Sequence, residues 1–225
     1  MSSDRQQVDF YFDIMCPWAY QSSKWIREVR AQNNLDISWK FFSLEEINRI
    51  EGKEHPWERE WSYGWSMLRI SAMLRRQSME DVDRYYEAAG RALHEEGRKP
   101  HSPEGSKEIL AEIGLDPDIV DMAIADPTTN DEVLADHNAV VDLGGFGVPI
   151  LVFPDGTTIF GPVVTPGPTG EAAMRLWDLT VGWQEFPHLY EMRRPKTEAD
   201  QAHIEEQFRP YVEARDWRTI SNPAP

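Results

Sequence analysis

The residue of this chain best placed to do chemistry is its single cysteine, Cys16. It follows an apolar segment and precedes a helix that we expect to begin at Pro17. Proline suits the first helical position, because the N–H that it lacks would have no partner there. The free N–H groups and the dipole at a helix start favour thiolate over thiol. The pattern therefore predicts that Cys16 is a nucleophile rather than a buried small hydrophobe, which is the usual role of a lone cysteine.

The residues after Cys16 change what such a thiol can do. A Cys-x-x-Cys motif between a strand and a helix is the redox signature of thioredoxin-like domains. This chain has Cys16, Pro17 and Trp18, but Ala19 stands where the second cysteine belongs. A mixed disulfide on Cys16 would therefore be resolved by an external thiol. A natural monothiol variant is the favoured origin of Ala19; a laboratory Cys→Ala substitution and a shift toward transferase chemistry stay open.

Other candidate side chains each have a structural interpretation as well. His94 is either a site residue or a histidine that suits a helix end because cations are favoured there. Trp57, Trp61 and Trp65 recur every four residues, which predicts one buried helix face, with Trp57 as the alternative wall of a cleft for a flat aromatic ligand. Asp13 either tunes Cys16 or caps local backbone N–H groups, and capping is favoured.

Composition excludes several classes of function. The 225 residues carry 23 Lys and Arg against 39 Asp and Glu, a net charge of −16, which argues against nucleic-acid binding. No apolar run reaches the ~18 residues of a membrane span, and no signal segment precedes the first strand, so we expect a cytoplasmic protein. The six histidines lack metal-ligand spacing, so we expect no metal. The paired glutamates at 45–46 and 95–96 are interpreted as solvated faces.

Hydrophobic patterns predict the elements that position the thiol. Strands are expected at residues 8–12 and 36–42, with a helix over 17–33 between them, which places Cys16 where ligands of α/β units collect. Residues 43–145 favour four or five helices separated by prolines. Strands at 148–153 and 157–160 form a hairpin, and a helix follows over 169–183. The segment beyond Pro187 receives no element, and both a wrapped and a mobile tail stay open.

This order of elements resembles the DsbA-like branch of the thioredoxin superfamily, which includes kappa-class glutathione transferases and hydroxychromene-carboxylate isomerases. It is most similar to actinobacterial mycothiol-dependent nitroreductases of that branch. The resemblance implies an α/β thioredoxin-like fold, β-α-β, helical insertion, β-β-α. It divides the chain into a thioredoxin-like domain (8–43 and 146–190), an inserted helical domain (44–145) and a C-terminal extension (191–225). The segments that carry it are 12–18, 25–26, 43–48, 94–97, 147–149, 160–163 and 170–178.

The resemblance also implies roles for single residues. Cys16 matches the nucleophilic thiol, and Pro149 matches a cis-proline whose loop offers the Val148 backbone to a thiol ligand by strand addition. Close members have a threonine where this chain has Val148, which removes a hydroxyl. Asn48 and His94 match polar positions that point toward the site. The expected thiol- and substrate-binding residues are Pro17, Trp18, Asn48, Trp57, His94, Val148 and Pro149.

Three functions follow, in order of preference. The first is a cytoplasmic thiol-disulfide oxidoreductase or thiol-dependent reductase in which Cys16 works with mycothiol or glutathione on a small electrophile or disulfide. The second is a kappa-type thiol S-transferase or isomerase, in which position 16 only donates a hydrogen bond to the thiolate of the cofactor. The third is a non-enzymatic protein that binds a hydrophobic ligand. The sequence leaves a homodimer open.

Overall fold

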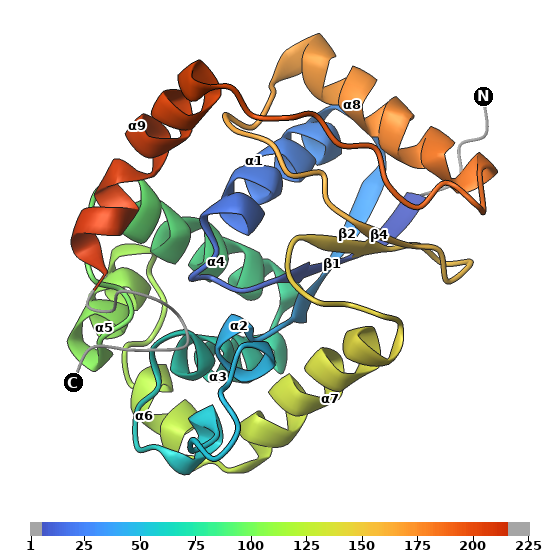
Figure 1. The fold of residues 1–225 in the computed structure, drawn as a ribbon. Coiled ribbons are helices and arrows are strands. Elements are labelled where there is room, and N and C mark those ends of the chain that lie inside the picture. Colours follow the sequence, from blue (N-terminus) through green and yellow to red (C-terminus); the bar gives the residue numbers. More distant parts are fainter. Residues whose placement is uncertain (1–5, 216–225) are drawn as a thin grey trace.

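Four strands form one sheet in the computed structural model, which describes residues 6–215. The strands are β1 (Gln6–Phe12), β2 (Leu35–Phe41), β3 (Ile150–Val152) and β4 (Thr158–Phe160). Their order across the sheet is β2-β1-β3-β4, with β1 parallel to β2 and antiparallel to β3 (Figure 1). The last two strands are shorter than predicted. Pro149 explains the late start of β3, because proline has no N–H to donate to a strand partner.

Helices make up most of the remaining described chain. The α-helices are α1 (Pro17–Gln32), α2 (Leu44–Ile47), α3 (Tyr63–Arg75), α4 (Met79–His94), α5 (Pro103–Glu112), α6 (Ile119–Ala125), α7 (Thr128–Asp142), α8 (Gly170–Gly182) and α9 (Glu198–Ala214). Two short 3₁₀ helices are η1 (Pro56–Glu58) and η2 (Trp183–Glu185). The segment between β2 and β3 is helical as predicted, but the expected four or five helices are too few, because the single turn of α2 adds a sixth. Within residues 6–215 no helix is long and apolar enough to cross a membrane.

Side chains of β1 alternate between two faces of the sheet, as a strand with period two requires. Val8, Phe10 and Phe12 lie in the large hydrophobic core with residues of α1, α4 and α8. Tyr11 points to the opposite face, where it joins a smaller cluster that includes Val140 of α7. Helices therefore cover both faces of β1, and the strand ends at the loop that carries the thiol.

The helix α9 is the element that the sequence patterns do not predict. A capping box fixes its start: the Thr197 hydroxyl accepts a hydrogen bond from the Asp200 N–H, and the Asp200 carboxylate accepts one from the Thr197 N–H. The helix packs against α4, and Figure 1 shows it beside α4 and the start of α1. Residues 186–197 connect it to the rest of the chain without helix or strand. The tail therefore wraps around the domain as far as it is described.

Candidate active site

Cys16 lies at the junction between β1 and α1, in the position that the sequence predicts. It is the N-cap of α1, and its sulfur accepts a hydrogen bond from the N–H of Ala19 at 3.4 Å. On its other side the thiol donates to the carbonyl of Val148 at 3.5 Å. Only 5% of the residue is exposed. The thiol is thus held between a helix start and the loop before β3.

The state of this thiol differs from the sequence-based expectation. Burial raises the pKa of Cys16 to about 12; the N–H groups of Ala19 and Trp18 lower the pKa, and the nearby Asp13 carboxyl raises it. The helix start therefore favours thiolate as predicted, but the expectation that Cys16 is a thiolate is wrong for this conformation. Removing a charged sulfur from water disfavours the thiolate more than two backbone donors favour it. In the closed site Cys16 is a neutral thiol.

Asp13 organises the loop that carries the thiol. Its carboxylate oxygens accept hydrogen bonds from the N–H of Met15 at 2.9 Å and from the N–H of Leu44 at 2.8 Å. The side chain is buried, and burial raises its pKa to about 7. The predicted capping role is confirmed. Asp13 also links the thiol loop to α2, a connection that no local pattern contains.

The loop before β3 provides the opposite wall of the site. The peptide bond between Val148 and Pro149 is cis, and both residues are buried. The carbonyl of Pro149 accepts a hydrogen bond from the N–H of Gly161 at 2.9 Å, which ties this loop to the segment after β4. The Val148 carbonyl that accepts from Cys16 is therefore presented by a backbone anchored on the sheet.

His94 lies beneath the thiol loop rather than on the surface. Its Nε2 is 2.7 Å from the carbonyl oxygen of Ile14, so this nitrogen carries the proton and donates. The ring stacks on Tyr20 with centroids 5.0 Å apart and lies 5.1 Å from the ring of Tyr211 in α9. Only 2% of the residue is exposed, and burial lowers its pKa to about 4. His94 is the last residue of α4, as the helix-end interpretation has it, but burial and the lowered pKa contradict the favoured cation of that interpretation.

Trp18 is covered from the C-terminal extension. It is half-buried, as is its neighbour Pro17. The ring of Phe208 meets the Trp18 ring edge-on, with centroids 4.8 Å apart and planes at 84°. The Nζ of Lys196 lies 5.4 Å from the centroid of the same ring, within range of a cation–π contact. Both contacts come from residues to which the sequence patterns assign no role.

These missed residues had one weak signal in the sequence. Phe208, Tyr211 and Ala214 are the buried residues of α9, and their spacing of three is that of a narrow helical stripe. Pro210 lies inside this stripe, and an internal proline is read as a helix break. The charged residues around these apolar positions are typical of a solvated tail. The apolar spacing therefore carried the information, but the proline obscured it.

Two predicted site residues do not pack around Cys16. Asn48 is exposed, and its side-chain amide donates to the carbonyl of Leu44 in its own helix at 2.8 Å. Trp57 lies in η1, stacked on His55 with ring centroids 4.2 Å apart. Trp61 lies between η1 and α3, so the three tryptophans do not share one helix face. The predicted single helix is wrong, because Arg59 is in an extended conformation and interrupts it. The core interpretation is confirmed, since Trp65 is buried and Trp57 and Trp61 pack against the same core.

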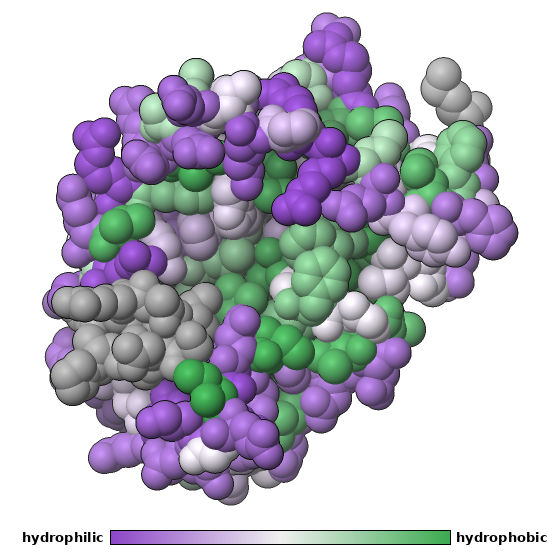
Figure 2. Space-filling view, in the orientation of Figure 1, coloured by the Kyte–Doolittle hydropathy of each residue, from purple (hydrophilic) through white to green (hydrophobic). Residues whose placement is uncertain are grey.

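Apolar side chains surround the thiol. Half-buried residues pack against the buried members of this cluster. On the face of the molecule drawn in Figure 2, hydrophobic residues gather in the middle and hydrophilic residues frame them. The buried members are Tyr11, Cys16, Ala19, Phe42, Val140, Val148 and Ile150. The half-buried members include Trp18, Leu44 and Ile47. Such surroundings suit the apolar part of a small ligand and keep the sulfur out of water.

The paired glutamates differ: Glu95 and Glu96 are exposed as predicted, whereas Glu45 and Glu46 are half-buried, which corrects the prediction for that pair. Glu45 accepts hydrogen bonds from Arg59 and from the Ser62 hydroxyl. Glu95 accepts from the Tyr20 hydroxyl at 2.9 Å and from Lys24 at 2.6 Å. These contacts fix the elements around the site. Among residues 6–215 no group of three or more His, Cys, Asp or Glu could hold a metal ion.

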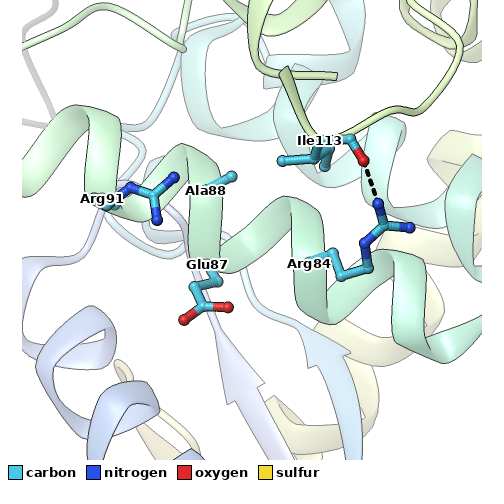
Figure 3. Close-up of a pocket in the computed structure, with 5 residues that line it drawn as sticks. All are labelled: Arg84, Glu87, Ala88, Arg91 and Ile113. Carbon is cyan, nitrogen blue, oxygen red and sulfur yellow. Dashed lines mark hydrogen bonds between the residues drawn. The ribbon is translucent and has the colours of Figure 1, made fainter. Parts of the chain in front are cut away.

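A surface pocket of about 300 Å³ lies elsewhere on α4 (Figure 3). Arg84, Glu87, Ala88 and Arg91 line it from the helix, and Ile113 closes it from the end of α5. Arg84 donates to the carbonyl of Ile113, and Arg91 pairs with Glu96 at 3.2 Å, so both cations of the pocket are already engaged. None of these residues belongs to the cluster around Cys16. The pocket and the thiol are separate features.

Comparison with known proteins supports the resemblance. Residues 15–194 match a family model described as Rv2466c-like, mycothiol-dependent nitroreductase Rv2466c. An uncharacterized protein of Mycobacterium tuberculosis, Rv2286c, is 53% identical over 214 residues, which are 95% of this chain and 93% of that protein.

Solved structures show the same fold. A probable DsbA oxidoreductase from Streptomyces coelicolor superposes with a TM-score of 0.55 at 18% identity, covering 85% of this chain and 93% of its own. A 2-hydroxychromene-2-carboxylate isomerase superposes with a TM-score of 0.58 at 15% identity, covering 80% and 95%. The predicted thioredoxin-like fold of the DsbA type is confirmed.

Proposed function

The chain belongs to the family of the mycothiol-dependent nitroreductase Rv2466c, and from this premise we propose that it is a thiol-dependent oxidoreductase whose single reactive group is Cys16. The proposed co-substrate is a low-molecular-weight thiol, mycothiol or glutathione. The proposed substrate is a small disulfide or electrophile, and the proposed compartment is the cytoplasm. The family supports the redox role.

One observation carries the proposal for this chain: the sulfur of Cys16 lies at the start of α1, within 3.4 Å of the Ala19 N–H and opposite the Val148 carbonyl. When a ligand sulfur takes the place of the Val148 contact, the thiol loses its acceptor and keeps the N–H donor that stabilises a thiolate. The same loop then offers its backbone to the ligand. The geometry therefore supports attack by Cys16 on a sulfur that lies against the Val148 loop.

The reaction closes with an external thiol, because Ala19 stands where a resolving cysteine would be. The Cys16 thiolate attacks one sulfur of a disulfide RS–SR′, so that a Cys16–SR bond forms and R′S⁻ leaves and takes up a proton. The thiolate of a second RSH then attacks the sulfur of R, releasing RS–SR and restoring Cys16. The net reaction is RS–SR′ plus RSH giving RS–SR plus R′SH.

Intact-mass measurement tests the proposal. The protein is incubated with mycothiol disulfide and, separately, with glutathione disulfide, and the mass of the chain is recorded before and after reduction. We expect one reducible adduct of the mass of one thiol, and no adduct on the Cys16→Ser variant. An unchanged wild-type mass with both disulfides contradicts the proposal. The disulfide that gives the faster adduct identifies the thiol.

A transferase or isomerase is the second candidate, and a specific observation favours it. In the closed site Cys16 is a neutral S–H donor, since it donates to the Val148 carbonyl and burial raises its pKa to about 12. Such a group can hold the thiolate of a bound cofactor by a hydrogen bond without forming a covalent bond. A serine at position 16 would donate in the same way. Retained thiol-dependent activity in Cys16→Ser, with no adduct on the wild type, would establish this function instead.

A further inference from the structure

The C-terminal helix α9 reaches the thiol site through two aromatic side chains. Phe208 packs edge-on against Trp18, two residues after the thiol, and Tyr211 packs against His94, which holds the carbonyl of Ile14 two residues before it. Phe208 is only 8% exposed. The two contacts therefore lie on either side of Cys16 along the chain.

The attachment of α9 is of a different kind from that of the other walls. The Val148 loop is anchored by the bond from the Gly161 N–H to the Pro149 carbonyl, and α2 is anchored by the bond from the Leu44 N–H to Asp13. Backbone hydrogen bonds hold both of these elements to the sheet or the thiol loop. Beside Cys16, Phe208 and Tyr211 of α9 make ring contacts, which tolerate sliding better than a directional bond does. Nearer its start, α9 is also tied to the segment after β4, where His203 Nε2 lies 3.3 Å from the carbonyl oxygen of Thr165.

The connection to α9 also allows movement. Residues 186–197 contain no helix or strand, and their large apolar side chains at Phe186, Tyr190 and Met192 are exposed rather than packed. Burial on α9 itself is confined to its last two turns, at Phe208, Tyr211 and Ala214. Segments with few buried contacts open at a lower free-energy cost than core helices. The first part of α9 and its connection therefore have little burial, while Tyr211 and Ala214 join the core.

We propose that α9 is a movable cover of the thiol site and that Phe208 sets the size of the molecule that reaches Cys16. The inference rests on the proposed function, because it concerns access to the same thiol. With Cys16 only 5% exposed, one neighbouring element must move before a disulfide sulfur can approach it. Among the walls described, α9 is the one that meets the residues beside Cys16 through ring side chains. Its opening uncovers Trp18 and widens the approach to the sulfur.

Alkylation of Cys16 tests the cover directly. The chain holds one cysteine, so every adduct reports on that thiol. Second-order rate constants are measured in the full chain with iodoacetamide, which is small, and with a fluorescein maleimide, which is bulky. In Phe208→Ala we expect the rate constant for the bulky reagent to rise about tenfold more than that for the small one, as the loss of a barrier of about 1.4 kcal/mol would give. Val212→Ala, an exposed position on the same helix, is the matched control and should leave both rates unchanged.

A conservative variant guards against a folding defect. Phe208→Leu keeps an apolar side chain but removes the ring edge on Trp18, so it should change the ratio of the two rates in the same direction by a smaller factor. A ratio that stays constant in both variants overturns the proposal, whether the two rates rise together or neither rises. Alkylation requires no disulfide exchange. The alkylation test can therefore contradict the movable cover while the mixed disulfide still forms. Conversely, the mixed disulfide can fail to form while the alkylation rates support the cover.

Discussion

The two sides of Cys16 are held by different forces. On one side, buried Asp13 accepts hydrogen bonds from Met15 and Leu44 and fixes the thiol loop to α2. On the other side, the ring of Phe208 packs edge-on against the ring of Trp18, and the Nζ of Lys196 lies 5.4 Å from the centroid of the same ring. Removing the acceptor of a buried N–H leaves that donor unsatisfied, whereas separating two rings leaves no polar group without a partner. The side with Asp13 therefore fixes the position of the thiol loop, and the side with Trp18 is the one that we expect to open for a ligand.

The largest expected effect breaks the rigid side. Asp13→Ala removes the acceptor of two backbone N–H groups, and each unsatisfied buried donor costs roughly 1–3 kcal/mol, so we expect the free energy of unfolding to fall by about 4 kcal/mol. Urea unfolding followed by circular dichroism measures it. Asp155→Ala is the control, since that carboxylate accepts from the Thr157 N–H in an exposed turn, and its loss should cost under about 1 kcal/mol. Equal losses would contradict the comparison.

The second effect is a pH dependence from His94. Its pKa is lowered from 6.5 to about 4 in the folded protein, so the stability that depends on the neutral ring is present above about pH 6.5 and is lost as the pH falls toward 4. The difference corresponds to about 3 kcal/mol. His94→Gln keeps a donor for the Ile14 carbonyl but does not titrate, so its stability should fall less steeply with acid.

The acid dependence is measured as a difference between variants, because Asp13 acts in the opposite direction. The pKa of Asp13 is raised from 3.8 to about 7, so its contribution to stability is present at low pH and is lost as the pH rises through that range. His188→Gln, at an exposed position, is the control for His94 and should keep the wild-type slope. If the free energy of unfolding of His94→Gln depended on pH as steeply as that of the wild type, the neutral form of the His94 ring would not be the source of this acid sensitivity.

The third effect sharpens the comparison on the mobile side. Phe208→Ala removes a mostly buried ring that is worth about 2 kcal/mol, so hydrogen exchange of the α9 amides should accelerate about 30-fold. The amides of α4 should keep their protection, because α9 opens without unfolding the core. Exchange measured by mass spectrometry separates the two helices. Equal acceleration in both would mean that α9 belongs to the cooperative core.

The smallest effect concerns the cation above Trp18. Lys196→Ala removes a cation–π contact at an exposed site, worth about 0.5–1 kcal/mol, so exchange of the α9 amides should rise only about twofold to fivefold. Lys53→Ala removes a similarly exposed lysine far along the chain and should leave α9 exchange unchanged. An effect as large as that of Phe208→Ala would show that charge, rather than ring packing, holds the cover.

The sequence predicts those features that short-range rules determine. The alternation of Val8, Phe10 and Phe12 gives β1, and Pro17 gives the start of α1, because period and helix-start chemistry depend on neighbouring residues only. The position of Cys16 follows from these two elements. The opposition of Val148 and Cys16 required the family resemblance, since no local rule links residues so distant in the chain.

The features that the sequence does not predict depend on tertiary burial. The pKa of Cys16 rises because Phe42, Val140 and other distant residues exclude water, and no motif around position 16 contains that information. The same is true of His94, for which the helix-end pattern predicts the position but not the burial. For α9 the local rules mislead, because Pro210 predicts a break in a helix that packing on α4 maintains.

The separation of the two walls along the chain has a consequence for biosynthesis. Cys16 and the Val148 carbonyl that accepts its S–H are 132 residues apart. A ribosome that adds about 5–20 residues per second needs on the order of ten seconds to make that stretch. Throughout this interval the nascent chain contains Cys16 but not the Val148 loop. The edge of β1 that pairs with β3 in the folded protein has no partner strand yet. Cys16 is therefore shielded from oxidants in the folded protein but exposed to them in the newly emerging chain.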